Sequence, residues 1–159
     1  MRFELVPMDG WAAERIAGWR YDPPYDLYDL DADPADYAEF LDPANWSDTY
    51  AVEAGDGTLV GFFEFDSADG AVEVALGMHP EYTGRGLGRA FVEAGLEFAR
   101  ERYEPERFEL AVAAFNDRAV SVYEAAGFER LETYPQVTNG GVHGFVRMGR
   151  GASPAARSQ

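Results

Sequence analysis

The clearest pattern of hydrophobic and polar residues lies in the middle of the chain. Hydrophobic residues occupy every second position from Val72 to Met78, which is the spacing of a strand with one buried face. Pro80 ends this strand, because proline has no amide hydrogen to donate to a neighbouring strand. From Leu87 to Phe98 the hydrophobic residues recur every three or four positions, as on one side of an amphipathic helix. We therefore predict a strand, a glycine-rich turn and a helix.

The rest of the chain carries further strand and helix patterns, separated by turns rich in glycine and proline. Strands are predicted over residues 3–6, 49–54, 59–67, 72–78, 107–113, 128–137 and 144–148, and helices over residues 9–19, 34–41, 87–103 and 116–127. This order predicts an α+β fold with a central mixed sheet of about seven strands. The strand after helix 87–103 should lie parallel to strand 72–78, because such crossovers are right-handed and return to the same sheet.

A chain of 159 residues has the size of one domain. We expect residues 1–150 to form this domain and residues 151–159, which are small and polar and include a proline, to form a disordered tail. No run of about 18 apolar residues is present, so no transmembrane helix and no membrane partner are expected. The first residues lack the apolar core of a signal peptide, which predicts a cytoplasmic protein.

The composition excludes several kinds of chemistry. The chain has no cysteine, which removes disulfides, thiol nucleophiles and zinc sites built on cysteine. All 13 basic residues are arginine, so a lysine Schiff base is excluded as well. The two histidines are not accompanied by a paired carboxylate motif, and no metal is expected.

The formal net charge of −16 argues against a nucleic-acid partner, because phosphate binding relies on clustered basic residues. Two interpretations of the acidity compete. A dense carboxylate surface keeps a protein dissolved in a high-salt cytoplasm, where self-repulsion is screened. Alternatively, the acidic residues form a local mouth for a cationic substrate. We favour adaptation to salt, because the acidic residues are spread along the whole chain.

Three glycines, Gly84, Gly86 and Gly88, separate the central strand from the following helix, with Arg85 and Arg89 among them. Glycine lets backbone N–H groups turn toward a ligand and lets the ligand approach closely. The N-terminus of the helix adds unpaired donors and a partial positive charge. The turn could also be a plain connection that needs positive φ angles, but the two arginines favour an anion such as a phosphate or pyrophosphate.

Two common phosphate-binding loops do not fit this turn. A Walker loop needs a lysine, and the dinucleotide fingerprint would place its last glycine at Arg89 or Phe91. The chain instead resembles motif A of the GNAT N-acetyltransferase superfamily, Arg/Gln-x-x-Gly-x-Gly/Ala, at Thr83-Gly84-Arg85-Gly86-Leu87-Gly88. Motif A wraps the pyrophosphate of acetyl-CoA in that family. Thr83 departs from the pattern, which implies more reliance on backbone donors and on nearby arginines.

A second stretch is similar to motif B of the same superfamily. That motif reads Asn-x-x-Ala, then Tyr seven residues after the Asn, then Gly-Phe. The matching residues here are Asn116, Ala119, Tyr123 and Gly127-Phe128. Both motifs occur in the order and spacing of the family, and the resemblance covers roughly residues 60–150. The first 50 residues carry no pattern that we match to it.

The resemblance implies a GNAT-type three-layer fold whose two strands beside the motif A helix splay apart to admit acetyl-CoA. It implies that the co-substrate is bound by Leu76, Met78, Thr83, Gly84, Arg85, Gly86, Leu87, Gly88, Arg89 and Asn116. The backbone of residues 76–78 would pair with the pantetheine amides, and the Met78 N–H would polarise the thioester carbonyl. Arg85, Arg89 and Arg118 would locally oppose the repulsion between the acidic protein and its anionic ligand.

The resemblance also implies catalytic roles. Tyr123 would be the general acid, with its hydroxyl near the sulfur, and Asn116 would bond the pantetheine arm. From the residues alone, Tyr123 could instead be a packed aromatic and Asn116 a helix cap.

The general base is the least defined of the predicted roles. Some family members place a Glu five residues before the motif B Asn, where this chain has Ala111. We therefore predict that Glu73 on the central strand acts as the base, directly or through water, with a solvated strand residue as the alternative. Glu109 and Glu64 are lesser candidates, and His79 is a weaker one still.

The implied function is an acetyl-CoA-dependent N-acetyltransferase that moves an acetyl group to a primary amine by direct attack in a ternary complex. The amine could belong to a small molecule or to a protein. The alternative is a non-catalytic module of the same fold that binds or senses acyl-CoA. Acetyl-CoA and an amine acceptor are the expected partners, and the protein could be a monomer or a homodimer. The aromatic, acidic segment 19–28 could be a packed loop or the wall of the acceptor site.

Overall fold

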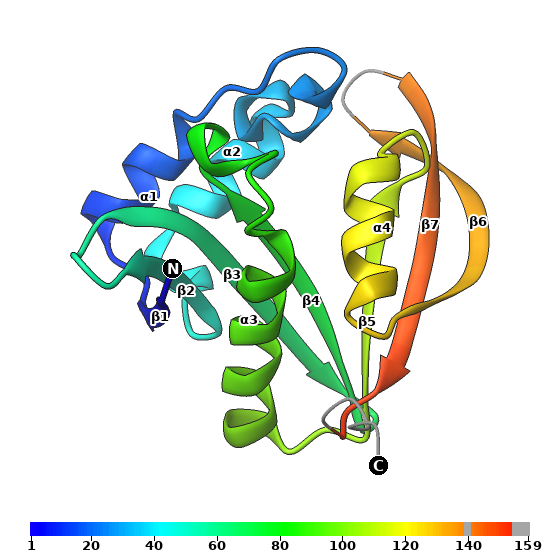
Figure 1. The fold of residues 1–159 in the computed structure, drawn as a ribbon. Coiled ribbons are helices and arrows are strands. Elements are labelled where there is room, and N and C mark those ends of the chain that lie inside the picture. Colours follow the sequence, from blue (N-terminus) through cyan, green and yellow to red (C-terminus); the bar gives the residue numbers. More distant parts are fainter. Residues whose placement is uncertain (139–140, 154–159) are drawn as a thin grey trace.

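The computed structural model describes residues 1–138 and 141–153, which form a seven-stranded sheet with helices on both faces (Figure 1). The strands are β1 (Phe3–Pro7), β2 (Thr49–Ala54), β3 (Leu59–Ala68), β4 (Ala71–Met78), β5 (Arg107–Ala113), β6 (Glu129–Thr138) and β7 (Gly141–Gly151). The α-helices are α1 (Gly10–Ala17), α2 (Pro34–Leu41), α3 (Gly88–Tyr103) and α4 (Asp117–Ala125). Short 3₁₀ helices lie between them: η1 (Tyr25–Tyr28), η2 (Leu30–Ala32), η3 (Pro43–Asn45) and η4 (Pro80–Tyr82). The predicted α+β fold with a mixed seven-stranded sheet is confirmed.

The sheet opens between its two central strands. The strand order is β1-β2-β3-β4-β5-β7-β6, and β4 and β5 form the parallel pair of this otherwise antiparallel sheet. They pair over three positions, from Ala71 opposite Arg107 to Glu73 opposite Glu109. Beyond these residues the strands diverge into a V, which Figure 1 shows with its closed end near the C-terminus. The expected splaying of the two strands is therefore confirmed.

The face of the sheet toward α3 and α4 carries the main hydrophobic core. Alternate residues of β4, Val72 and Val74, are buried there, as the two-residue period predicts. α3 lies close to β3, since a Cβ atom at Gly95 would be 2.2 Å from the Phe63 ring. A glycine at this position thus allows the helix to rest directly on the sheet.

The opposite face of β2 and β3 is covered by α1 and α2. Ala51 and Phe62 are partners in the sheet and share this face. They pack with Ile16 and Phe40 in a second hydrophobic cluster. The molecule therefore has three layers, with the sheet between the pair α1/α2 and the pair α3/α4 (Figure 1). No helix within the described ranges is long and apolar enough to cross a bilayer.

The C-terminal strand continues further than the sequence predicted. β7 ends at Gly151, and the amide of the buried Ala152 donates a hydrogen bond to the carbonyl oxygen of Glu106 at 3.0 Å. Residues 151–153 thus belong to the fold and not to the predicted disordered tail, because the backbone here has a fixed partner. The rest of that tail, residues 154–159, lies outside the described residues.

Candidate active site

A cavity of about 810 Å³ occupies the space between the diverging halves of β4 and β5. Its walls come from β3, β4, β5, α3, α4 and the segment before α2. Figure 1 shows this segment, in blue, arching over the open end of the V. The cavity is lined by Gly84 and Gly86 of the glycine-rich turn and by Glu64 and Glu73 on the α1/α2 face of the sheet. It therefore connects the two sides of the sheet through the gap between the strands.

The edge of β4 along this gap presents backbone groups to the cavity. The His79 N–H donates to the Val60 carbonyl oxygen on β3 at 2.8 Å. Because peptide groups of successive residues in a strand point to opposite sides, the N–H groups of Leu76 and Met78 point away from β3, toward the gap. Both residues line the cavity. The Met78 carbonyl oxygen accepts a hydrogen bond from the Tyr21 hydroxyl at 2.7 Å.

The glycine-rich turn brings helix α3 to the cavity with its first amides uncapped. Gly84 and Gly86 have φ angles of +74° and +75°, a region that residues with a Cβ atom rarely adopt. α3 begins at Gly88, and no side chain caps its first turn. A helix N-terminus with unpaired N–H groups and a flanking glycine turn is a binding site for an anion. The conformation of the turn thus explains the glycines and permits the predicted phosphate contact.

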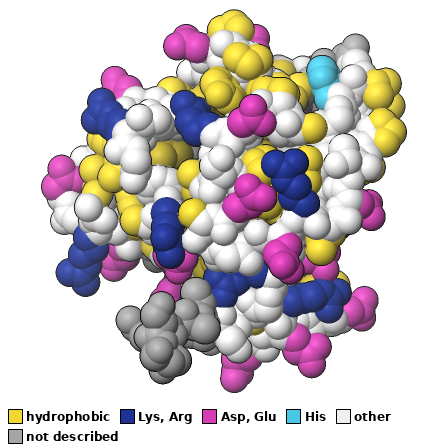
Figure 2. Space-filling model, turned by 45° about the vertical axis from the view of Figure 1, so that its right-hand side comes forward, with side chains coloured by type: hydrophobic (Ala, Val, Ile, Leu, Met, Phe, Trp, Pro, Cys, Tyr) yellow, Lys and Arg dark blue, Asp and Glu magenta, His cyan; other side chains and the backbone are white. Residues whose placement is uncertain are grey.

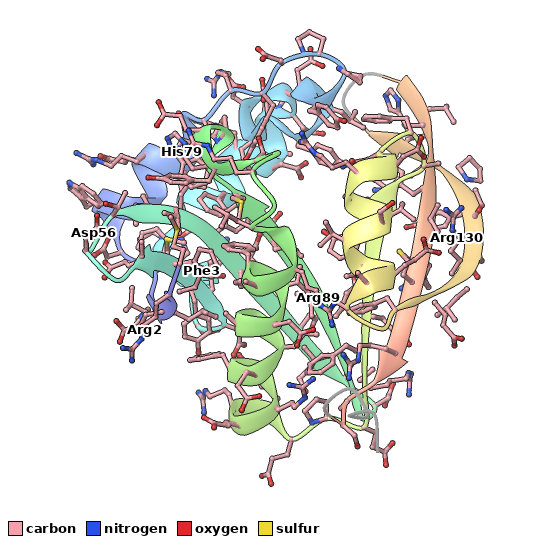
Figure 3. All side chains as sticks on the ribbon, viewed as in Figure 1. Arg2, Phe3, Asp56, His79, Arg89 and Arg130 are labelled. Atoms are coloured by element: carbon pink, nitrogen blue, oxygen red, sulfur yellow. The ribbon has the colours of Figure 1, made fainter. Side chains whose placement is uncertain are left out.

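Two of the three expected arginines line the cavity. Arg89 does so from α3, and Figure 3 shows it extending toward the side on which α4 lies. Arg118 does so from α4, where its Nη1 would lie 3.3 Å from a Cβ atom at Gly84. The Arg85 guanidinium instead lies 5.5 Å from the centre of the Tyr82 ring. Like Leu87, Arg85 is not among the cavity-lining residues.

Thr83 and His79 both shape the turn through local hydrogen bonds. The Thr83 hydroxyl donates to the Pro80 carbonyl oxygen at 2.8 Å, and Thr83 also lines the cavity. The His79 Nδ1 atom accepts a hydrogen bond from the Glu81 N–H at 3.0 Å and caps η4. His79 lies beyond the end of β4 (Figure 3) and outside the cavity lining. This geometry assigns His79 a structural contact.

Tyr123 reaches the cavity from the middle of α4. Its ring packs edge-on against Phe128, and its hydroxyl makes no hydrogen bond with any described residue. Burial, and to a lesser extent the nearby Tyr28, raise the pKa of Tyr123 above its ordinary value. A raised pKa keeps the phenol protonated at neutral pH, so its O–H can donate to a group in the cavity.

Asn116 is a buried helix cap. Its Oδ1 atom accepts a hydrogen bond from the Ala119 N–H at 3.0 Å, at the start of α4. Its Nδ2 atom donates to the Tyr28 hydroxyl at 3.1 Å. The capping role that the sequence left open is therefore present, and Asn116 also lines the cavity. The predicted contact with pantetheine stays a prediction.

The carboxylates near the cavity have different surroundings. Glu73 has 58% of its side chain exposed and lies 3.9 Å from the Arg147 guanidinium. Glu109 lies 2.7 Å from Arg107 and 3.3 Å from Arg147, and these bonds, above all the one to Arg107, hold its pKa below the ordinary value. Glu64 is partly buried in the cavity wall, and burial raises its pKa, followed by repulsion from Glu39 and Asp36.

Three tyrosines of the N-terminal segment also line the cavity: Tyr21, Tyr25 and Tyr28. The Tyr25 ring lies under the Arg118 guanidinium at 4.5 Å. The segment therefore forms a wall of the cavity, and its predicted role as the wall of the acceptor site stays a prediction. Its aromatic content was the available signal, but the sequence did not single out these side chains, because their reach depends on the path of the loop.

The chain is similar to proteins of several bacteria that are named mycothiol acetyltransferase. That of Kineococcus radiotolerans is 36% identical over 132 residues, 82% of this chain and 42% of the relative. That of Propionibacterium freudenreichii is 42% identical over 83 residues, 48% of this chain and 26% of the relative. This chain thus spans less than half the length of either relative.

Solved structures share the fold. The spermidine N-acetyltransferase of Vibrio cholerae, in complex with CoA and spermine, superposes with a TM-score of 0.76 at 20% identity, over 94% of this chain and 95% of that one. A GNAT-family acetyltransferase of Bacillus anthracis superposes with a TM-score of 0.73 at 16% identity, over 96% of both chains. At these identities the likeness establishes the fold.

A sequence model described as "Acetyltransferase (GNAT) family" matches residues 13–128. This range includes the glycine-rich turn, β5 and all of motif B, and each of these three stretches contributes residues to the lining of the cavity. The chain belongs to the GNAT acetyltransferase family.

Proposed function

We propose that this protein is an acetyl-CoA-dependent N-acetyltransferase that acetylates a primary amine of a small molecule or a protein. The observation that carries this proposal is the cavity that passes through the sheet. An anion-binding turn lies at one end, the exposed edge of β4 runs along it, and carboxylates line the other face. Such a passage allows the thioester and the amine to approach one another from opposite sides of the sheet.

The chain offers a group for each part of acetyl-CoA. The amides after Gly84 and Gly86 and the start of α3 would hold the pyrophosphate, with Arg89 and Arg118 supplying positive charge. The backbone of Leu76 and Met78 would pair with the pantetheine amides along the β4 edge. The Met78 N–H would then donate to the thioester carbonyl oxygen, where negative charge develops during attack.

Two side chains would move protons. The amine must be neutral to attack, because an alkylammonium with a pKa of about 10.4 has no free lone pair. Glu64 and Glu73 both line the cavity and could accept the proton. The raised pKa of Glu64 favours it over the sequence-based choice of Glu73, because a base works best when its pKa is close to the working pH. The Tyr123 hydroxyl would donate to the sulfur as the carbon–sulfur bond breaks.

The names of the relatives and structural neighbours support an amine as the acceptor. Charge at the cavity supports it too: burial above all, and then repulsion from Glu39 and Asp36, raise the pKa of Glu64, so further carboxylates lie near the proposed acceptor end of the cavity. A negative field attracts an ammonium group before it loses its proton.

The test is release of free CoA thiol from acetyl-CoA in the presence of a panel of polyamines, amino-terminal peptides and aminoglycosides. Thiol release that requires one class of amine is the expected result. If acetyl-CoA raises the melting temperature but no amine of the panel releases thiol, the alternative of a non-catalytic acyl-CoA-binding module is favoured. If acetyl-CoA does not bind, both assignments fail.

A further inference from the structure

The Tyr28 hydroxyl occupies an unusual position in the cavity wall. Tyr28 ends the 3₁₀ helix η1 in the segment that arches over the V. Its oxygen accepts one hydrogen bond from the Ala113 N–H, at 3.3 Å, and one from the Asn116 Nδ2 atom, at 3.1 Å. Ala113 is the last residue of β5 and Asn116 is the cap of α4. One phenol thus ties the N-terminal segment to both elements.

The direction of both hydrogen bonds is fixed by the backbone. The Ala113 N–H can act only as a donor. The Asn116 Oδ1 atom is held by the Ala119 N–H, so the nitrogen of the same amide faces Tyr28 and must donate. The two lone pairs of the Tyr28 oxygen are therefore occupied, and its proton points elsewhere. No described residue accepts that proton, and Tyr28 lines the cavity.

The hydroxyl lies level with the site proposed for the thioester. If the pairing of Glu73 with Glu109 continued along both strands, Ala113 would stand opposite Gly77, next to Met78. On the β4 side of the gap, the Tyr21 hydroxyl donates a hydrogen bond to the Met78 carbonyl oxygen. Tyr28 is also close enough to Tyr123 to affect its pKa. Two phenols thus line the same part of the gap.

The two phenols differ in how well they can lose a proton. Burial raises the pKa of Tyr28, but the hydrogen bonds from Asn116 and Ala113 act in the opposite direction, because they stabilise the phenolate. Tyr123 has no such partner among the described residues, and its pKa is raised by burial and by Tyr28. A phenol that accepts two N–H bonds is also a stronger hydrogen-bond donor through its own O–H.

We propose that Tyr28 is a second catalytic hydroxyl, which donates its proton to the departing sulfur together with or in place of Tyr123. The inference rests on the proposed acetyl transfer. The amine nitrogen bonds to the carbonyl carbon, the carbon–sulfur bond breaks with its electron pair on sulfur, and the Tyr28 O–H proton moves to that sulfur. The base takes the proton of the amine. The Tyr28 phenolate, held by the two N–H donors, regains a proton from water after the products leave.

The first test is steady-state kinetics of Tyr28→Phe, Tyr123→Phe and the double variant, with Tyr37→Phe as the control. Tyr37 lies on α2, away from the cavity lining. We expect Tyr28→Phe to lower kcat by at least about tenfold while KM for acetyl-CoA stays within a few-fold, as for a lost proton donor. The double variant should be slower than either single one. A Tyr28→Phe enzyme with unchanged kcat and weaker acetyl-CoA binding would overturn the proposal and leave Tyr28 a structural residue.

Asn116→Asp provides a second variant in case Tyr28→Phe does not fold. Aspartate is as good a helix cap as asparagine, so α4 is kept. Its carboxylate replaces an N–H donor with an acceptor, so the Tyr28 proton would turn toward it and away from the cavity. We expect a fall in kcat comparable to that of Tyr28→Phe, with the melting temperature retained. A folded Asn116→Asp enzyme with normal kcat would contradict the proposal.

A binding measurement separates this inference from the proposed function. By calorimetry, the wild type should bind CoA more tightly than desulfo-CoA, because the sulfur accepts from Tyr28. Tyr28→Phe should lose this preference and Tyr37→Phe should keep it. If the preference is lost as expected but no amine is acetylated, the contact stands and the enzyme assignment fails. If amines are acetylated and the preference persists in Tyr28→Phe, the assignment stands and the role of Tyr28 is wrong.

Discussion

At the scale of single residues, the proposed acceptor side of the cavity holds two glutamates in contrasting surroundings. Glu64 is partly buried near Glu39 and Asp36, whereas Glu73 is largely exposed and lies near Arg147. Burial and like charges favour the neutral form of a carboxyl group, and exposure leaves the ionised form solvated. Glu64 is therefore better suited than a solvated carboxylate to take up the proton of the amine.

The matched variants Glu64→Gln and Glu73→Gln decide between these residues. If Glu64 is the base, kcat of the wild type should rise with pH through the raised pKa of Glu64, because the ionised form is the active one. Glu64→Gln should lower kcat by about 10²-fold and remove this limb of the profile. If the rise of kcat with pH is retained in Glu64→Gln and lost in Glu73→Gln, Glu73 is the general base.

The same raised pKa has a consequence for stability. The pKa of Glu64 is higher in the folded state than in the unfolded state, where that of Glu is about 4.3. Such a group contributes its whole stabilisation below the unfolded pKa. This stabilisation is lost as the pH rises through the folded pKa. Glu64→Gln should therefore melt at a higher temperature than the wild type at neutral pH, and the difference should shrink on acidification. Melting curves from pH 4 to pH 8 measure this; a lower melting temperature of Glu64→Gln at neutral pH would contradict it.

At the scale of elements, the site exists because β4 and β5 separate while each keeps its other neighbour. β4 stays paired with β3 along its whole length, and β5 stays paired with β7. Along the gap, the edges of β4 and β5 would leave backbone N–H and C=O groups without hydrogen-bond partners. Such unpaired groups destabilise the folded state where they are partly buried. Two tyrosines of the N-terminal segment reduce this cost, Tyr21 on the β4 edge and Tyr28 on the β5 edge. The remaining groups are available to a ligand.

Replacing Gly86 with aspartate tests the glycine-rich turn as the pyrophosphate site. Acetyl-CoA should raise the melting temperature of the wild type, as any ligand of the folded state does. Gly86→Asp should abolish this shift, because a carboxylate would face the pyrophosphate. Gly57→Asp is the matched control: both glycines have positive φ and open space around a Cβ atom, but Gly57 lies in the turn between β2 and β3. An unchanged shift in Gly86→Asp would refute the site.

At the scale of the whole molecule, negative charge dominates the surface. Figure 2 shows acidic side chains spread over the visible face without a single cluster. Ion pairs between described residues involve five of the 29 acidic side chains. Most carboxylates thus have no ion-pair partner among the described residues, so they repel one another and also repel an anionic ligand. Arg89 and Arg118 oppose this field at the cavity.

Added salt should therefore strengthen acetyl-CoA binding or leave it unchanged, whereas it weakens binding at most phosphate sites. The screening length is about 30 Å at 0.01 M and about 3 Å at 1 M ionic strength, so salt removes the long-range repulsion and leaves contacts in place. We expect acetyl-CoA binding to tighten or stay level from low to molar KCl, and the melting temperature to rise. A steady fall of both with KCl would exclude adaptation to high salt and would favour the acidic segment 22–36 as a mouth for a cationic substrate.

The sequence by itself determined the order of the elements and the position of the glycine-rich turn. These features depend on neighbouring residues in the sequence. A two-residue period defines β4, and Asp9 and Asn116 cap the helices that they precede. Gly84 and Gly86 adopt positive φ angles, which glycine tolerates best. The resemblance to motif B added Tyr123 to the predicted site, and in the structure Tyr123 lies on α4 and lines the cavity.

Only the tertiary structure decided which side chains share the cavity. The sequence favoured Arg85, which lies between the glycines of the turn, over Arg118, but the path of the turn leaves Arg85 beside Tyr82 and the docking of α4 brings Arg118 to Gly84. The surroundings of Glu64 depend on α2, which is distant in sequence, and the contact of Tyr28 with Ala113 joins residues 85 positions apart. A local sequence pattern determines which side chains lie on the same face of a helix or strand. The burial and the charge around those side chains depend on the elements that pack against that face, and these can be distant in sequence.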